Sequence, residues 1–223
     1  MKYPFTPELL DSLPEELAEL YRSLELKLLD EICSRLKIAG ELNEVTVQDI
    51  RALRSHGIDL SEIEKAIQRT ANISRKELDK LLDEVVERNQ RYYTDLIDLA
   101  GVTQPETMVS SADINAILSQ AQREVGNLTR SMGFLLDNGR TMLPYARAYQ
   151  WALDSAEMQI MSGAISYNQA IKSAVKQLAD SGLRMVDYES GHRDHIDVAA
   201  RRAVMTGVSQ ICAKYTEQSA EYL

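Results

Sequence analysis

Two long stretches of the chain carry apolar residues at helical spacing, and they constrain the fold more than any other feature. In each stretch the apolar positions step by three or four, which is the period of one face of an α-helix. Residues 13–37 and 74–100 each predict a helical rod of roughly 35–40 Å at 1.5 Å per residue. Rods of this length favour an elongated helical bundle or coiled-coil pairing. The two stripes are Leu13, Leu17, Leu20, Leu24, Leu28, Ile32 and Leu36, then Leu78, Leu81, Leu82, Val85, Val86, Tyr92, Tyr93, Leu96 and Ile97.

Start and stop signals flank both stretches. Each begins at a Ser-x-x-Glu capping box and is followed by a glycine. The first has Ser12 and Glu15 at its start and Gly40 after its end, and the second has Ser74 and Glu77 at its start and Gly101 after its end. Residues 1–11 hold Pro4 and Pro7. They are predicted to form an extended arm that either docks on a neighbour or is strapped to the helix that follows.

Between the two stretches, residues 45–71 predict a pair of short helices around a glycine turn at His56-Gly57. This outline resembles a helix-turn-helix. The second helix, 62–69, mixes acidic and basic side chains, whereas a recognition helix presents a cationic, amide-rich face. Helical packing is therefore the favoured interpretation.

A domain boundary is predicted at residues 101–111, which combine glycine, proline and hydroxyl residues without periodicity. The acidic excess also falls before this point, with 21 acidic and 14 basic residues in 1–100 against 13 and 11 in the remainder. The predicted organisation is an N-terminal helical region over 1–100, a linker over 101–111, and a C-terminal helical region over 112–223. Helices are predicted in the last region at 112–130, 144–161 and 166–179.

The period changes near the end of the chain. Residues 183–188 alternate apolar and polar side chains, as a β-strand does, and Ser190-Gly191 supply a turn into a second strand at 193–196. Asp194 is predicted to cap a last helix that reaches about Tyr222. Small residues face inward on this helix and would let another backbone approach closely: Ala199, Ala200, Ala203 and Gly207. The predicted fold class is mainly α, with one small β-hairpin before the last helix.

Composition narrows the function classes. The net charge of −9 argues against a surface that cradles nucleic acid, because phosphate binding needs a positive footprint. No apolar run approaches the ~20 residues of a membrane span, so no membrane partner is expected. The two cysteines, Cys33 and Cys212, lie inside helical patterns and are interpreted as buried thiols in a reducing compartment.

The only metal-like cluster consists of His192 and His195 with Asp194 and Asp197 nearby. Zinc sites take three or four clearer ligands, so the two histidines are weak candidates and no metal or cofactor is expected. There is no glycine-rich phosphate loop and no G-x-S-x-G nucleophile elbow. The sequence therefore predicts no catalytic residues and no enzyme.

Three arginines, Arg193, Arg201 and Arg202, form a local positive patch beside the predicted hairpin. They could contact DNA phosphates or an acidic partner. The favoured interpretation is that Arg201 and Arg202 neutralise the nearby carboxylates Asp194, Asp197 and Glu189.

The segment 186–210 resembles the phage minor capsid protein family, in its minor capsid protein 2 group, through the pattern Val186-Asp187-Tyr188-(x)₂-Gly191-(x)₅-Asp197-Val198-Ala199-x-Arg201-Arg202-Ala203-Val204-x-Thr206-Gly207-Val208-x-Gln210. Shorter matches elsewhere extend the similarity over essentially the whole chain: Tyr3-Pro4-(x)₃-Glu8, Leu17-(x)₂-Leu20-Tyr21, Ile32-Cys33-x-Arg35-Leu36 and Tyr145-(x)₃-Tyr149-x-Trp151-Ala152.

The resemblance implies a non-enzymatic structural protein of a bacteriophage or prophage, assembled with portal or capsid proteins during head morphogenesis. It implies a place in the virion, and in the bacterial cytoplasm during assembly. Self-association and DNA contact stay open as further interactions. The motif residues are interpreted as structural or partner-binding. They are expected to form the turn, cap the last helix, neutralise nearby charges and allow close helix packing: Tyr188, Gly191, Asp194, Asp197, Arg201, Arg202 and Gly207.

Two alternatives follow from the same features. The first is a DNA-contacting packaging or ejection factor that uses residues 45–71 or the arginine patch. The second is the N-terminal delivery portion of a longer protein. Family members often continue into a variable, toxin-like C-terminal portion, and this sequence stops at Leu223, so any activity of that portion is expected to be absent.

Overall fold

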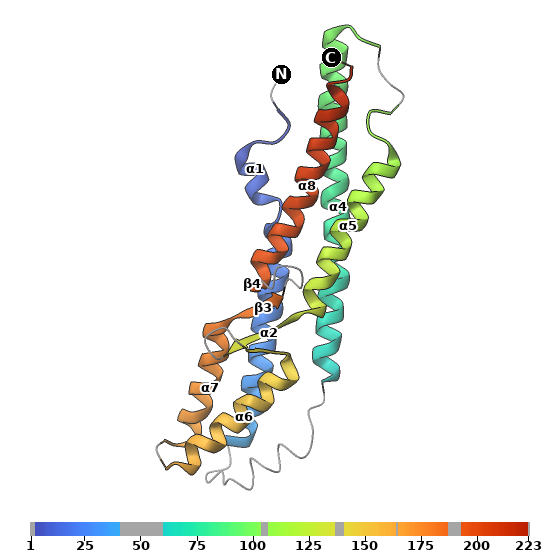
Figure 1. Cartoon of the computed structure of the whole chain (residues 1–223). Helices are drawn as coiled ribbons and strands as arrows, with labels where there is room; N and C mark the ends of the chain where they lie inside the picture. Colours follow the sequence, from blue (N-terminus) through green and yellow to red (C-terminus); the bar gives the residue numbers. More distant parts are fainter. Residues whose placement is uncertain are drawn as a thin grey trace. The chain divides into compact units, whose positions relative to one another are not determined.

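The fold is mainly α-helical with one small antiparallel sheet (Figure 1). The structure is a computed structural model that describes residues 3–40, 60–103, 107–136, 141–163, 165–186 and 193–222. The predicted fold class, including an antiparallel pair of strands directly before the last helix, is confirmed.

Contacts between Cα atoms divide the chain into two compact units. Unit 1 comprises residues 1–21, 70–130 and 197–223, and unit 2 comprises residues 22–69 and 131–196. Both units are discontinuous in sequence. The domain boundary expected at residues 101–111 stays a prediction.

Unit 1 is built from helices. They are α1 (Pro7–Ser12), the first turns of α2 (Glu15–Gly40), most of α4 (Ser61–Ala100), α5 (Ser111–Arg130) and α8 (Ile196–Ser219). In Figure 1, α8 runs alongside α4 and α5. The predicted apolar face of residues 78–97 lies in their shared core, together with Phe5, Leu17, Met108, Val109, Ala121, Val125, Ala203, Val204, Val208, Ile211 and Tyr215.

The predicted extended arm at residues 1–11 is wrong from Pro7 onward, because α1 begins there. Thr6 caps this helix, with its Oγ1 accepting a hydrogen bond from the Leu9 backbone N–H at 3.3 Å. The capping box expected at Ser12 is also absent. The Ser12 hydroxyl donates to the Leu9 carbonyl oxygen at 2.8 Å, so it closes α1 rather than opening α2.

A second correction concerns Ser74. The sequence predicted a new helix starting there, but α4 continues through it without interruption. The Ser74 hydroxyl donates to the Thr70 carbonyl oxygen at 2.7 Å, one turn back, and the residue is fully buried. The predicted helix-turn-helix outline can be followed only from residue 60, because residues 45–59 lie outside the described part of the chain.

Unit 2 contains most of α2, two helices and the sheet. The helices are α6 (Tyr145–Met161) and α7 (Tyr167–Ser181), which pack on each other and on the sheet. As predicted, Ser166 and Gln169 form a capping box at the start of α7. The apolar side of α2 is buried in this unit through Leu24, Leu28, Ile32 and Leu36.

The antiparallel sheet has four strands in the order β2-β1-β3-β4. They are β1 (Met132–Leu136), β2 (Thr141–Leu143), β3 (Leu183–Val186) and β4 (Arg193–His195). The pairing of β3 with β4 is the predicted hairpin. The other two strands, β1 and β2, were not predicted from the sequence. In the structure, a Cβ at Gly133 would lie 2.6 Å from the Leu143 carbonyl oxygen, so this glycine is the residue that lets β1 and β2 approach.

Candidate functional site

The motif that links the hairpin to the last helix is only partly described. Tyr188, Gly191 and the weak metal candidate His192 lie outside the described residues. Asp194 lies in β4 opposite Met185, and α8 begins two residues later at Ile196. The cap expected from Asp194 therefore stays a prediction. The remaining motif residues lie on α8: Asp197, Arg201, Arg202 and Gly207.

His195 makes a contact that bears on metal binding. Its Nε2 lies 2.9 Å from a terminal nitrogen of Arg184. A guanidinium group can only donate hydrogen bonds, so Nε2 must accept this one and its lone pair is engaged. The ring also lies over Gly182, where an added Cβ would be 2.6 Å from His195 Cε1. In the described residues, no group of three or more His, Cys, Asp or Glu side chains is placed to hold a metal ion.

Arg201 forms an ion pair with Glu15 at the start of α2. The sequence had placed the counter-charge within the hairpin and the first turn of α8, whereas the structure supplies it from a helix 186 residues away in the chain. Both side chains are partly exposed, so the pair contributes modestly to stability. Its effect is to connect the start of α8 with the start of α2 inside unit 1.

Gly207 provides the close approach that the small face of α8 predicted. A Cβ at this position would lie 3.3 Å from both methyl carbons of Leu82 and 3.5 Å from the Ala121 Cβ. The glycine therefore sits where α8 packs against both α4 and α5. Its role within the described residues is helix packing.

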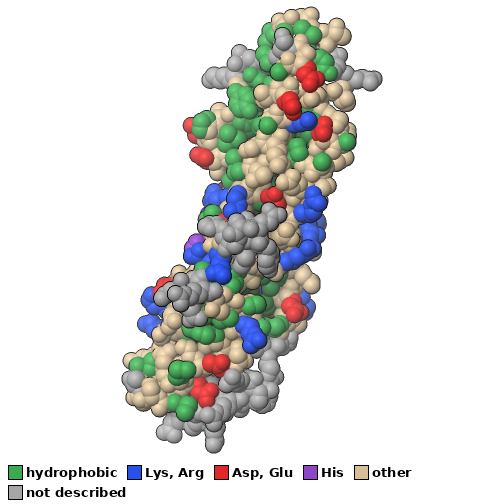
Figure 2. Space-filling model, in the orientation of Figure 1, with side chains coloured by type: hydrophobic (Ala, Val, Ile, Leu, Met, Phe, Trp, Pro, Cys, Tyr) green, Lys and Arg blue, Asp and Glu red, His purple; other side chains and the backbone are tan. Residues whose placement is uncertain are grey.

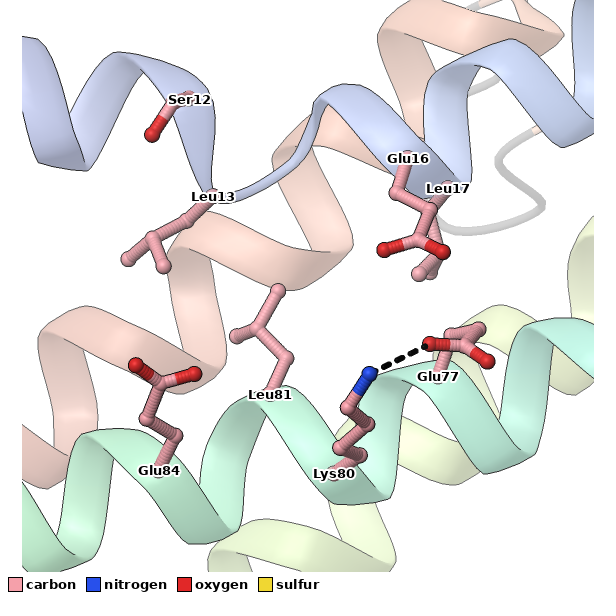
Figure 3. Close-up of a pocket in the computed structure, with 8 residues that line it drawn as sticks. All are labelled: Ser12, Leu13, Glu16, Leu17, Glu77, Lys80, Leu81 and Glu84. Atoms are coloured by element: carbon pink, nitrogen blue, oxygen red, sulfur yellow. Dashed lines mark ion pairs between the residues drawn. The ribbon is translucent and has the colours of Figure 1, made fainter.

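A surface groove lies between the α1–α2 junction and α4, all within unit 1 (Figure 3). Its volume is about 180 Å³, below the few hundred Å³ of typical small-molecule sites. Leu13 and Leu81 are partly buried beside the fully buried Leu17. The other lining residues are polar: Ser12, Glu16, Glu77, Lys80 and Glu84.

Sequence reasoning missed this groove because it expected an extended arm at residues 1–11 with Ser12 as the cap of the long helix, so α1 and its junction with α2 were not predicted. Two local signals could have revealed it. Pro14 favours the first turn of a new helix, and a run of carboxylates follows it at Glu15 and Glu16. The opposite wall cannot be inferred locally, since the α4 residues that line it, Glu77 to Glu84, lie at least 60 positions further along the chain.

Burial of tyrosine rings in unit 2 raises the pKa of their hydroxyl groups. Desolvation raises the pKa of Tyr145 to about 12, and it raises the pKa of Tyr167 to about 12. The Tyr167 hydroxyl donates to the Leu36 carbonyl oxygen at 2.8 Å, whereas the buried Tyr145 hydroxyl has no hydrogen-bond partner in the described structure. These rings stay neutral at physiological pH and serve as packing groups between α2, α6 and α7.

Acidic, basic and apolar side chains all occur on the face drawn in Figure 2. Several large apolar side chains are well exposed, including Met158 and Met161 one turn apart on α6. No helix in the described ranges combines the length and apolarity needed to cross a bilayer.

The family model described as phage minor capsid protein 2 matches residues 5–222. No curated protein and no solved structure matches the chain. The family match includes both units and the hairpin–α8 motif.

Proposed function

The chain belongs to the phage minor capsid protein 2 family, and on that premise we propose that it is a non-enzymatic head protein that assembles with portal or capsid proteins. The family assigns it to the structural proteins of phages. The finer proposal places it in the virion, after assembly in the bacterial cytoplasm.

The observation that carries this proposal is the extent of the family match, which runs from residue 5 to residue 222. A match of this extent includes the whole described fold rather than one common helix pair.

The experiment is to follow the protein through phage assembly. Purified virions are analysed by mass spectrometry for this chain, and the chain is co-expressed with the portal protein and separately with the major capsid protein. We expect the chain in virions and co-elution with at least one of the two. Absence from virions, together with no co-elution with either protein, would refute the proposal.

DNA contact is the second hypothesis from the sequence, and the structure adds no observation in its favour. Arg201 of the proposed patch is engaged by Glu15. A duplex-binding assay at low salt tests it, since phosphate contacts strengthen as salt is removed. A salt-dependent shift of labelled duplex would support it, and no shift would end it.

A further inference from the structure

The groove of unit 1 has an apolar floor whose side chains converge. Figure 3 shows Leu13 from the α1–α2 junction and Leu81 from α4 pointing toward the same space. Both are only partly buried, although they border the core that contains Leu17. Part of their apolar surface is therefore left open to solvent, and an apolar side chain placed over it would gain by burial.

The size of the groove limits what can occupy it. A volume of about 180 Å³ is too small for a drug-sized ligand or a cofactor, whose sites span roughly 300–1,000 Å³. It suits one or two side chains that project from another protein. Small pockets filled by single anchoring side chains often contribute much of the affinity of protein interfaces.

The rim of the groove is acidic, and its charges are incompletely balanced from within the protein. Glu16 has no ion-pair partner among the described residues. Glu77 faces Lys80 across 3.8 Å, but the Lys80 side chain is 77% exposed and loosely held. Glu84 is the exception, because Arg88 pairs with it at 2.6 Å.

A cation that entered the groove would therefore meet the carboxylates of Glu16 and Glu77. Figure 3 shows Glu16 directed toward Glu77 and Lys80. Lys80, the one cationic side chain among the described residues that line the groove, can swing into solvent. Charge pairs at the edge of an apolar contact add specificity and speed to association.

We propose that this groove binds a basic amphipathic segment of a partner protein, with a leucine-sized side chain over Leu13 and Leu81 and a lysine or arginine between Glu16 and Glu77. The inference deepens the proposed function, since it rests on the chain assembling with other head proteins. It names the chemistry of the segment that such a partner would present.

The test uses the full chain and labelled helical peptides of about 14 residues. The first peptide carries leucine for the apolar contact and lysine for the acidic rim. The second has glutamate in place of the lysine, and the third has serine in place of the leucine. Only the leucine–lysine peptide is expected to bind saturably, as measured by fluorescence anisotropy. Substitution Glu16→Lys is expected to weaken that binding roughly tenfold.

Asp95→Lys is the matched control. Asp95 is an exposed carboxylate with no ion-pair partner among the described residues, and it lies 11 residues beyond Glu84 on α4, or about 16 Å along the helix. Asp95→Lys therefore changes the net charge by the same amount as Glu16→Lys, but at a position away from the groove. Binding by this variant is expected to stay within about twofold of the unsubstituted chain.

Three results would overturn the inference. They are no binding of the leucine–lysine peptide up to about 1 mM, equal binding of the serine–lysine peptide, and equal weakening by Glu16→Lys and Asp95→Lys. The last two would show attraction to the net negative charge alone. Circular dichroism and thermal melting confirm that each variant is folded.

Failure of the inference can be told apart from failure of the proposed function. If the unsubstituted chain is absent from virions and binds neither portal nor capsid protein, the proposed function fails whatever the peptides do. If it is present in virions and Glu16→Lys is incorporated as well as Asp95→Lys, only the groove's role is refuted.

Discussion

Gly207 of α8 lies against Leu82 of α4, so closely that an added Cβ would be 3.3 Å from both leucine methyl carbons. Leu82 is fully buried and belongs to the core of unit 1. Tight interiors resist added volume, because neighbouring side chains must leave their preferred rotamers. The absence of a side chain at Gly207 is thus a packing requirement of unit 1.

The first prediction follows from this contact. Gly207→Val should lower the free energy of unfolding by about 2–3 kcal/mol, because the three added carbons, Cβ and two methyl groups, would meet Leu82 and Ala121. Gly207→Ala should change it by less than about 1 kcal/mol, since a small shift of Leu82 is offset by the helix propensity of alanine. Urea denaturation of both variants measures this. A Val variant as stable as the Ala variant would contradict the close packing.

The second prediction compares two tyrosines of unit 2, the buried Tyr145 and the half-buried Tyr167. Tyr167→Phe should cost about 1 kcal/mol, because its hydroxyl donates to the Leu36 carbonyl oxygen. Tyr145→Phe should be neutral or stabilising, because the hydroxyl it removes is buried without a partner in the described structure. The two variants remove the same atom, so each controls for the other in chemical denaturation. A larger loss for Tyr145→Phe would show that its hydroxyl has a partner.

The third prediction concerns alkaline pH. Burial raises the pKa of Tyr145 and of Tyr167 to about 12, from 10 in an unfolded chain. The unfolded chain therefore loses these protons first. The stability from the neutral rings is fully present below about pH 10 and declines as pH rises toward about 12. We expect on the order of 1 kcal/mol from each ring.

Denaturation midpoints between about pH 9 and about pH 12 measure this decline. The double variant Tyr145→Phe/Tyr167→Phe should show a shallower dependence on pH, since both titrating groups are gone. An unchanged slope would mean that other groups dominate the alkaline loss of stability.

The fourth prediction concerns Arg201 and Glu15. A double-mutant cycle with Arg201→Gln and Glu15→Gln should give a coupling energy below about 1 kcal/mol, because both side chains are partly exposed. The coupling should shrink further at high salt, where exposed charges are screened. A coupling of several kcal/mol would indicate a buried network at the start of α8.

The helices themselves could be predicted where their signals are local. The capping box at Ser166 and the apolar stripe ending at Leu36 depend on neighbours within one or two turns, so spacing alone revealed them. The β3–β4 pairing was accessible for the same reason, since alternation and a Gly turn lie within about 14 residues.

Errors arose where a local signal had two meanings. Ser74 is a good cap residue, but burial against the core of unit 1 favours donation to the Thr70 carbonyl within a continuous helix. Gly133 is a common helix breaker, but it permits the approach of β2. Which of the two structures forms at each residue depends on contacts with residues that are distant in the sequence.

The sequence by itself determined the mainly helical class, the strands before the last helix and the family, because these depend on periodicity and on a long residue pattern. The tertiary structure alone decided that Glu15 is the partner of Arg201, that Leu82 lies against Gly207, and that Leu13 and Leu81 share one groove. The physical reason is that each of these relationships joins residues on different helices. No local spacing encodes which helix faces which.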